Sequence, residues 1–232
     1  MVGITPDMRQ ILVDWLVDVH QSFELKEQTL YLALIYLNEY ASQHEITKHE
    51  YQLVGISCLW IASKYEEIYP PRMQNYVQVT DSCYTVSELK AMESKVLLAL
   101  KFNLTYTTPL QILEAVIEKW PKDHHGKLTR ESMKILNMCK YIIELSLFEG
   151  LGREYCMKTV VVSSIMLADS VLKTKSDSKV LETDKESIMK CFKEMCQALT
   201  NVCRPSVKLR AIKKKYSHEK YLAVGKFRIE QR

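Results

Sequence analysis

Apolar residues return every three to four positions along most of this 232-residue chain, which is the spacing of helices with one buried face. Leu30, Ala33, Leu34 and Leu37 keep this spacing without interruption. Helix breakers are sparse, since Gly and Pro each occur six times, and the chain is therefore expected to be all-α. The pattern predicts helices at 6–23, 27–42, 49–66, 72–79, 86–101, 108–120, 129–147, 155–171, 185–203 and 206–216.

Two of these segments carry further local signals. The segment 49–66 includes "LVGISCLWIASKYEE" and is apolar on all sides in its middle, which is typical of a buried central helix that ends before Pro70. The segment 86–101 follows Thr85, and Glu88 stands three residues further on. This spacing predicts a capping box at the start of that helix.

A weak internal repeat indicates two related halves. "ISCLWIAS" at 56–63 is similar to "VSSIMLAD" at 162–169, in the middle of an apolar segment in both cases. We expect two tandem five-helix bundles, one at 1–104 and one at 105–232, the second ending in a basic tail. The polar loop at 173–185 is expected to be exposed.

The first helix has two apolar stripes, more than a helix needs to dock on one core. Either the helix is sandwiched and both stripes are buried, or one stripe forms an open apolar cleft with a Trp floor that suits short peptides. The candidate open stripe contains Met8, Ile11, Leu12, Trp15 and Val19, with Asp18 beside it. The second stripe contains Val13, Leu16 and Val17.

Composition narrows the functional classes. A net charge of +4 is too small to indicate nucleic-acid binding by itself. The seven cysteines form no CxxC pair, and we interpret most of them as small buried hydrophobes of a reducing compartment. His124-His125 lies in a polar loop and is a poor metal ligand set, so no metal and no cofactor are expected. No apolar run reaches the length of about 18 residues needed to span a membrane.

Several motifs, taken in order, resemble the cyclin box. They are "MRQILVDWLVDV" at 8–19, "YQLVG" at 51–55, "ASKYEEIYPP" at 62–71, "TDSCYT" at 80–85 and "MESKVLLAL" at 92–100. In the second half, "YIIELSLFE" at 141–149 and "KKYSHEKYLAV" at 214–224 resemble the C-terminal box of mitotic cyclins. The chain is thus similar to A- and B-type cyclins, with the B-type favoured.

The resemblance implies a non-catalytic subunit that binds and activates a cyclin-dependent Ser/Thr protein kinase in G2/M progression, in nucleus and cytoplasm. Cyclins do this by packing on the C-helix and activation segment of the kinase, whose activity depends on that helix. The chain itself contains no GxxxxGK[ST], GxGxxG or HExxH motif. The family's N-terminal helix and degradation signal are not found, which is expected of a cyclin core fragment or a short cyclin.

The kinase contacts of the family map first onto Lys64 and Glu93. From the residues alone, the two charges are expected to pair and staple two helices, because an unpaired buried charge is costly. The resemblance implies that they also hydrogen-bond the kinase backbone. It adds a further set of contacts, of which Phe102 and Leu104 would otherwise be assigned to the core. The added residues are Tyr65, Glu67, Ile68, Leu97, Phe102 and Leu104.

The stripe on the first helix maps onto the family's docking patch for substrates or inhibitors with an Arg-x-Leu motif. Met8, Ile11, Leu12 and Trp15 would hold the Leu of the peptide. Asp18 would attract its Arg, and Gln52 would hydrogen-bond its backbone. One buried Leu with two such hydrogen bonds corresponds to micromolar affinity, about −8 kcal/mol.

Three positions depart from the family pattern. Asp18 stands where Glu is common, and Tyr51 where an aliphatic residue is usual. Asn38 stands where cyclins carry an Asp opposite Arg9. Arg9 is then expected to make a neutral hydrogen bond to Asn38, or to find another partner such as Asp14.

An alternative class remains open, because cyclin-box folds also form cores of transcription factors that bind DNA or the basal machinery. That function requires strongly basic helix ends and a steep salt dependence of binding. The basic end of the chain is expected to be a solvated helix face with a frayed terminus. Its charges are Lys208, Arg210, Lys213, Lys214, Lys215, Lys220, Lys226 and Arg228.

Overall fold

The computed structural model describes residues 4–150, 154–176, 184–202 and 210–227. These residues form ten α-helices and two 3-10 turns, with one isolated antiparallel bridge between Lys122 and Leu128, which confirms the all-α prediction. The chain divides into two compact units, Met1–Thr108 and Pro109–Arg232, so the division falls four residues after the expected position, 104/105.

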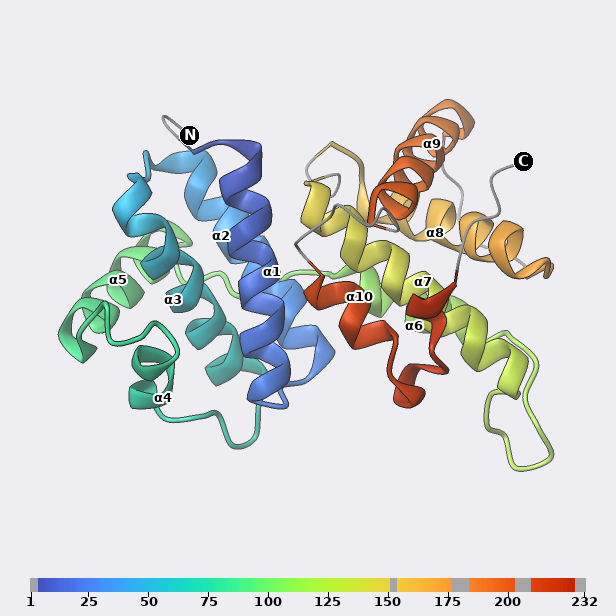
Figure 1. The fold of residues 1–232 in the computed structure, drawn as a ribbon, viewed down its shortest axis with the longest axis horizontal. Helices are drawn as coiled ribbons and strands as arrows, with labels where there is room; N and C mark the ends of the chain where they lie inside the picture. Colours follow the sequence, from blue (N-terminus) through green and yellow to red (C-terminus); the bar gives the residue numbers. More distant parts are fainter. Residues whose placement is uncertain (1–3, 151–153, 177–183, 203–209, 228–232) are drawn as a thin grey trace. The chain divides into compact units, whose positions relative to one another are not determined.

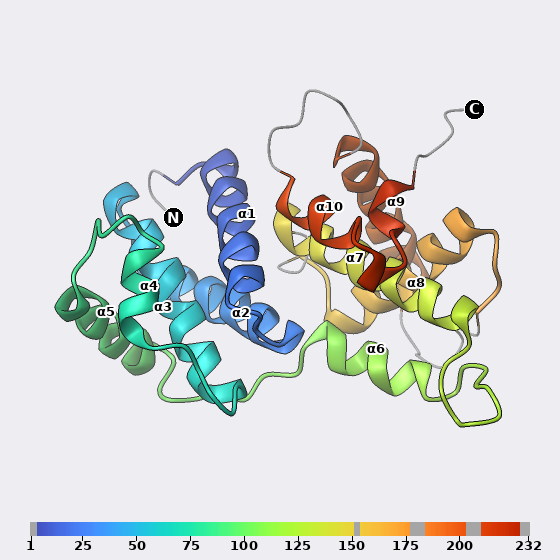
Figure 2. The same ribbon diagram turned by 60° about the horizontal axis from the view of Figure 1, so that its bottom comes forward.

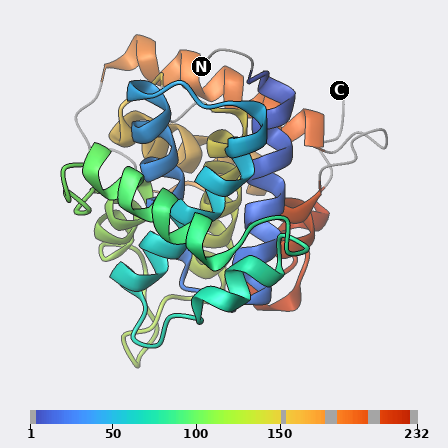
Figure 3. The same cartoon turned by 90° about the vertical axis from the view of Figure 1, so that its left-hand side faces the viewer.

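The first unit contains five helices arranged around α3. They are α1 (Pro6–Ser22), α2 (Glu27–Gln43), α3 (Lys48–Glu66), α4 (Met73–Gln78) and α5 (Val86–Ala99). Helix α3 packs against α1, α2 and α5 (Figure 1), and α4 and α5 lie together against it when the unit is seen from the side (Figure 3). Cys58, Leu59 and Ala62 of α3 are fully buried, which confirms the prediction of a buried central helix.

Helix starts in this unit follow the local signals of the sequence. The Thr5 side chain accepts a hydrogen bond from the Met8 amide at 3.2 Å, and Pro6 occupies the first helical position, where its missing N–H is not needed. At α5 the capping box is complete. The Glu88 amide donates to Thr85 Oγ1 at 3.2 Å, and the Thr85 amide donates to Glu88 Oε2 at 2.7 Å. The predicted capping box is confirmed.

Gly55 allows α1 to approach α3 closely. A Cβ at Gly55 would lie 3.0 Å from both Cδ atoms of Leu12, nearer than side chains normally come. Leu12 is accordingly 5% exposed and belongs to the α1–α3 contact. The candidate open stripe of α1 is therefore split, since Val19 is buried as well, whereas Ile11 is 57% exposed.

The second unit repeats this arrangement. Helix α8 packs against α6, α7 and α9, as α3 packs against α1, α2 and α5 (Figure 2), in agreement with the similarity between 56–63 and 162–169. Gly150 ends α7 in the left-handed conformation, at φ 86°, which glycine adopts without strain. The elements are α6 (Pro109–Ile117), α7 (Arg130–Glu149), α8 (Met157–Leu172), α9 (Lys185–Val202), α10 (Ala211–Tyr216), η2 (Glu219–Tyr221) and η3 (Val224–Lys226).

One charge of the basic tail is not solvated. Lys215 is 1% exposed, and its Nζ lies 2.5 Å from Oε1 of Glu144, whose side chain is 2% exposed. The Tyr216 hydroxyl donates to the same oxygen at 2.8 Å. The expectation of a wholly solvated basic face is therefore wrong at Lys215, because this side chain is buried against Glu144. The partner lies on α7, 71 residues away in sequence, so the local charge pattern does not indicate it.

Some expectations lie outside the described residues. These are the end of the helix predicted at 185–203, the first part of the one at 206–216, most of the loop at 173–185, and the charges Lys208 and Arg228. Among the cysteines that are described, Cys58, Cys139 and Cys191 are buried, whereas Cys83 and Cys156 are exposed. Burial thus holds for only part of the cysteine set.

Candidate functional site

A salt bridge joins α3 to α5 at the edge of the first unit. The Lys64 ammonium pairs with Glu93 Oε1, and the Trp60 indole donates to Glu93 Oε2 at 3.1 Å. The ammonium also lies 4.9 Å from the centre of the Trp60 ring. The side chain of Lys64 is 39% exposed and that of Glu93 is 13% exposed. The expected staple between two helices is therefore present, and it remains accessible to a partner.

Large apolar side chains are exposed on and just after the two helices that this salt bridge joins. Tyr65 is 47% exposed, Ile68 79% and Phe102 65%, while Leu97 and Leu104 are half-buried. Exposed apolar groups that gather on one face are typical of interaction sites. We call this face the α3–α5 surface; it consists of Lys64, Tyr65, Ile68, Glu93, Leu97, Phe102 and Leu104.

Two exposed side chains were missed by the sequence interpretation. Tyr69 is 91% exposed and follows Ile68 directly, and Leu98 is 67% exposed on α5. The position of Tyr69 before Pro70 and Pro71 was an available signal, because the prolines end the helix and leave the aromatic ring outside it. For Leu98 the signal was weaker, since an amphipathic helix turns one of two adjacent leucines away from its core.

Hydrogen bonds fix the segment that carries Phe102 and Leu104. The Tyr36 hydroxyl donates to the Leu104 carbonyl at 2.8 Å, and Tyr65 Oη and Thr105 Oγ1 share a hydrogen bond of 2.9 Å. Burial raises the pKa of Tyr36 well above its usual range, so the phenol stays protonated and keeps donating. The two hydroxyls thus attach this segment to α2 and α3.

The backbone at Phe102 is held in an unfavourable conformation. Lys101 and Phe102 have φ angles of 51° and 55°, in the left-handed region that favours glycine. A side chain in this region costs roughly 1–2 kcal/mol. The left-handed turn is part of the cap of α5, because the Lys101 amide donates to the Leu98 carbonyl at 3.0 Å and the Phe102 amide donates to the Leu97 carbonyl at 2.9 Å. The cap explains the backbone but not the exposed aromatic ring of Phe102, which is the feature that points to a role in binding.

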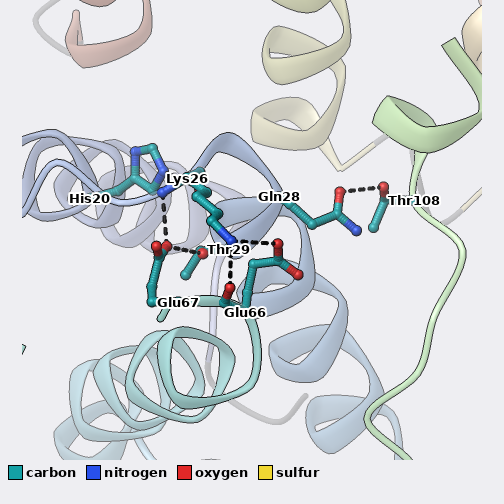
Figure 4. Close-up of polar contacts among 7 residues, drawn as sticks. All are labelled: His20, Lys26, Gln28, Thr29, Glu66, Glu67 and Thr108. Carbon is teal, nitrogen blue, oxygen red and sulfur yellow. Dashed lines mark hydrogen bonds and ion pairs between the residues drawn. The ribbon is translucent and has the colours of Figure 1, made fainter. Parts of the chain in front are cut away.

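Glu67 differs from the other expected contacts because its carboxylate is engaged within the chain. Glu67 Oε1 accepts hydrogen bonds from the Lys26 amide at 2.8 Å and from Thr29 Oγ1 at 2.5 Å. The Lys26 ammonium in turn donates to the Glu66 carbonyl at 2.8 Å. Figure 4 shows this network between the start of α2 and the end of α3.

The expected peptide-docking residues lie mainly on one side of α1. Ile11 and Asp18 are exposed, and Met8, Trp15 and Gln52 are half-buried. Leu12 is buried against α3, so it can support such a surface but offers little contact area to a partner. We call the accessible set the α1 surface: Met8, Ile11, Trp15, Asp18 and Gln52.

Arg9 and Asn38 join α1 to α2. Arg9 is 7% exposed, and its Nη1 donates to Asn38 Oδ1 at 3.0 Å. The neutral hydrogen bond expected from the sequence is therefore present.

No cluster of three or more metal-binding side chains occurs among the residues that the structure describes. Within the same ranges, no helix is long and apolar enough to cross a bilayer.

Known protein families match both halves of the chain. The family described as "Cyclin, N-terminal domain" matches residues 2–105, and the family described as "Cyclin, C-terminal domain" matches residues 108–230. Among curated relatives, Cyclin-A1-4 of Oryza sativa subsp. japonica is 34% identical over 97% of this chain and 63% of its own length. Cyclin-A1 of Homo sapiens is 34% identical over 96% of this chain and 46% of its own length.

B-type relatives match to a similar extent. The G2/mitotic-specific cyclin-B of Marthasterias glacialis is 32% identical over 96% of this chain and 56% of its own length. The B-type preference drawn from the sequence is therefore unsupported, since A-type relatives match as well. The chain spans between about half and two thirds of the length of these three relatives.

Solved structures support the fold. A viral cyclin from herpesvirus saimiri superposes with a TM-score of 0.69 at 20% identity, over 84% of this chain and 87% of its own. The structure titled "Crystal Structure of the yeast RNA Pol II CTD kinase CTDK-1 complex" includes a chain that matches with a TM-score of 0.62 at 13% identity, over 91% of this chain and 75% of its own.

Proposed function

Since this chain belongs to the cyclin family, we propose that it binds and activates a cyclin-dependent Ser/Thr protein kinase through the α3–α5 surface. Members of this family are non-catalytic regulatory subunits, in agreement with the expectation that the chain is not itself an enzyme. The observation that carries the proposal is the exposure of Ile68 and Phe102, which follow the ends of the two helices that the Lys64–Glu93 pair joins.

The physical role of such a surface is to place one helix of the kinase. Kinase activity needs the C-helix positioned so that its Glu pairs with the catalytic Lys. A rigid partner can supply that position without chemistry of its own, by burying apolar side chains and offering a few fixed polar groups. The salt bridge fits this role, because Lys64 retains donor capacity toward solvent while Glu93 holds it in place.

The proposal is tested by the double substitution Lys64→Ala and Glu93→Ala. Binding to a purified cyclin-dependent kinase should weaken by at least about 10-fold, because two polar anchors of the surface are lost. Helicity measured by circular dichroism should stay unchanged. The matched control is Glu118→Ala with Lys119→Ala, two exposed charges just beyond α6. Unchanged affinity in the first variant would remove the pair from the interface.

We further propose that the α1 surface recruits substrates or inhibitors with an Arg-x-Leu motif. Apolar contact is available from Ile11, the indole of Trp15 and the thioether of Met8. Asp18 provides the negative charge that an Arg requires. Trp15→Ala with Met8→Ala should spare phosphorylation of a short peptide that lacks the motif and lower it for proteins that carry the motif. Equal losses on both substrates would mean that these side chains only support the core.

The cellular setting is a proposal as well. The relative from Marthasterias glacialis is named a G2/mitotic-specific cyclin, which supports a role in G2/M progression for this chain. Presence in both nucleus and cytoplasm stays a prediction that imaging of a tagged chain can test. The alternative, a scaffold that binds DNA, predicts affinity that falls steeply with salt, whereas a mixed protein interface resists moderate salt.

A further inference from the structure

Two helix ends meet beside the turn that joins α1 to α2. Helix α2 begins after Lys26, which has no side-chain cap, so the start of this helix leaves amides in need of acceptors. Helix α3 ends at Glu66, and its last carbonyls need donors in the same way. Residues at each of these helix ends provide the hydrogen-bond partners that the other end lacks.

Glu67 supplies the missing acceptor for α2. Its Oε1 accepts the Lys26 amide at 2.8 Å and the Thr29 hydroxyl at 2.5 Å. Thr29 lies in the first turn of α2 and is fully buried. The carboxylate therefore lies at the positive end of a 17-residue helix, where its charge is favoured.

Lys26 supplies the donor for α3. Its Nζ donates to the Glu66 carbonyl at 2.8 Å and lies 3.4 Å from the Glu66 carboxylate. The ammonium is thus at the negative end of α3, again the favourable end. Figure 4 shows how Glu66, Glu67, Lys26 and Thr29 enclose the junction.

The third helix of the junction is α1. His20 is 3% exposed, and its Nε2–H donates to the Lys26 carbonyl at 2.9 Å. Both the amide and the carbonyl of Lys26 are therefore held, one by α3 and the other by α1. The backbone directly after Glu67 carries Ile68 and Tyr69, which are 79% and 91% exposed. Within the described ranges, the amides of these two residues make no backbone hydrogen bond.

We propose that Glu67 is a positioning residue of the α3–α5 surface and not a direct kinase contact. Its carboxylate caps α2 and thereby fixes the backbone from which Ile68 and Tyr69 project. This inference rests on the proposed function, because it assigns a role within the kinase-binding surface. Fixing two exposed apolar side chains before binding reduces the ordering cost that association would otherwise carry.

The buried hydroxyl of Thr29 allows a sharp test. Thr29→Val keeps the shape of the side chain, removes the hydrogen bond to Glu67, and alters a group that no partner can reach. Kinase affinity should fall by about 3- to 10-fold in Thr29→Val and by about 10-fold in Glu67→Ala. In the double variant the loss should be no greater than in Glu67→Ala, because both substitutions remove the same contact.

Direct contact predicts a different result. If Glu67 touches the kinase, Thr29→Val binds the kinase like the unsubstituted chain, Glu67→Ala does not, and the proposal is overturned. Affinities are measured well below the unfolding temperature, so that a loss of stability does not enter. Glu45→Ala, which removes an exposed carboxylate beyond the other end of α2, is the matched control and should leave affinity unchanged.

A readout on the free chain separates this inference from the proposed function. Amide hydrogen exchange of Lys26 should accelerate by at least about 10-fold in Glu67→Ala, because the acceptor of this amide is removed. The amide at position 67, which donates to the Ser63 carbonyl at 2.9 Å, should also exchange faster as the end of α3 loosens. Unchanged exchange at both amides would refute the positioning role. If exchange is faster in Glu67→Ala but the unsubstituted chain binds no kinase, the capping role of Glu67 is confirmed and the proposed kinase binding is wrong.

Discussion

Replacing Phe102 by glycine should stabilise the free chain and weaken its binding to a kinase, two effects of opposite sign. Phe102 has a φ of 55° and is 65% exposed. Glycine adopts this backbone conformation without strain, and the ring that is lost contributes little packing within the chain.

The size of each effect follows from the structure. Relief of the left-handed conformation is worth roughly 1–2 kcal/mol, from which about 0.5–1 kcal/mol is lost to the greater freedom of glycine in the unfolded chain. The free energy of unfolding should therefore rise by about 0.5–1 kcal/mol. For binding, two thirds of a ring area of about 200 Å² at ~25 cal/mol per Å² gives an upper limit of about 3 kcal/mol, or about 150-fold in Kd.

Two assays and one control decide the outcome. Urea unfolding followed by circular dichroism gives the stability, and isothermal titration with a purified cyclin-dependent kinase gives the affinity. Lys101→Gly is the matched control, because Lys101 has a φ of 51° and an exposed side chain outside the proposed contacts. It should gain similar stability and keep its affinity. Destabilisation of Phe102→Gly by more than about 1 kcal/mol, with unchanged affinity, would refute the reasoning and return Phe102 to the core.

Other sites give predictions of the same kind. Lys215→Met should cost about 3–5 kcal/mol of unfolding free energy, because it leaves the buried Glu144 carboxylate without its counter-charge, and adding Glu144→Gln should recover most of the loss; a loss below about 1 kcal/mol in urea titrations would contradict the buried pair. Asn38→Asp should raise the free energy of unfolding by about 1 kcal/mol at neutral pH, since the hydrogen bond from Arg9 becomes charge-assisted. The gain should disappear in acid, where the new carboxylate is protonated, and equal unfolding free energies of the variant and the unsubstituted chain across this pH range would contradict the prediction. Hydrogen bonds from Thr159 and from the first amides of α8 lower the pKa of Cys156, so its alkylation by iodoacetamide, followed by mass spectrometry, should persist to lower pH than that of a free cysteine; an ordinary pH profile would exclude the lowered pKa.

Local signals in the sequence predicted the helices well. Thr85 and Glu88 specify their capping box within four residues, and Pro6 starts α1 for a reason that is equally local. The pairing of Lys64 with Glu93 could also be predicted, because two charges on apolar helices have few other means of avoiding a desolvation cost.

Partners that lie far apart in the sequence could not be predicted from the pattern of apolar and charged residues. Lys215 appeared to belong to a solvated basic face, yet its partner Glu144 lies on α7. Leu12 appeared to share an open stripe, yet Gly55 has no side chain, so α1 packs closely against α3 and Leu12 is buried between them. Glu67 was assigned to a partner surface by its place in a motif, whereas its carboxylate is engaged by the first turn of α2. In each case the deciding neighbour is set by tertiary packing.

The central claim is tested most directly by phosphate transfer from a purified cyclin-dependent kinase to a short peptide, with and without this chain. We expect a large activation that saturates as the chain is added and that is weakened by Phe102→Gly but not by Lys101→Gly. Absence of both activation and binding across several such kinases would contradict it, and would leave a cyclin fold that serves another partner.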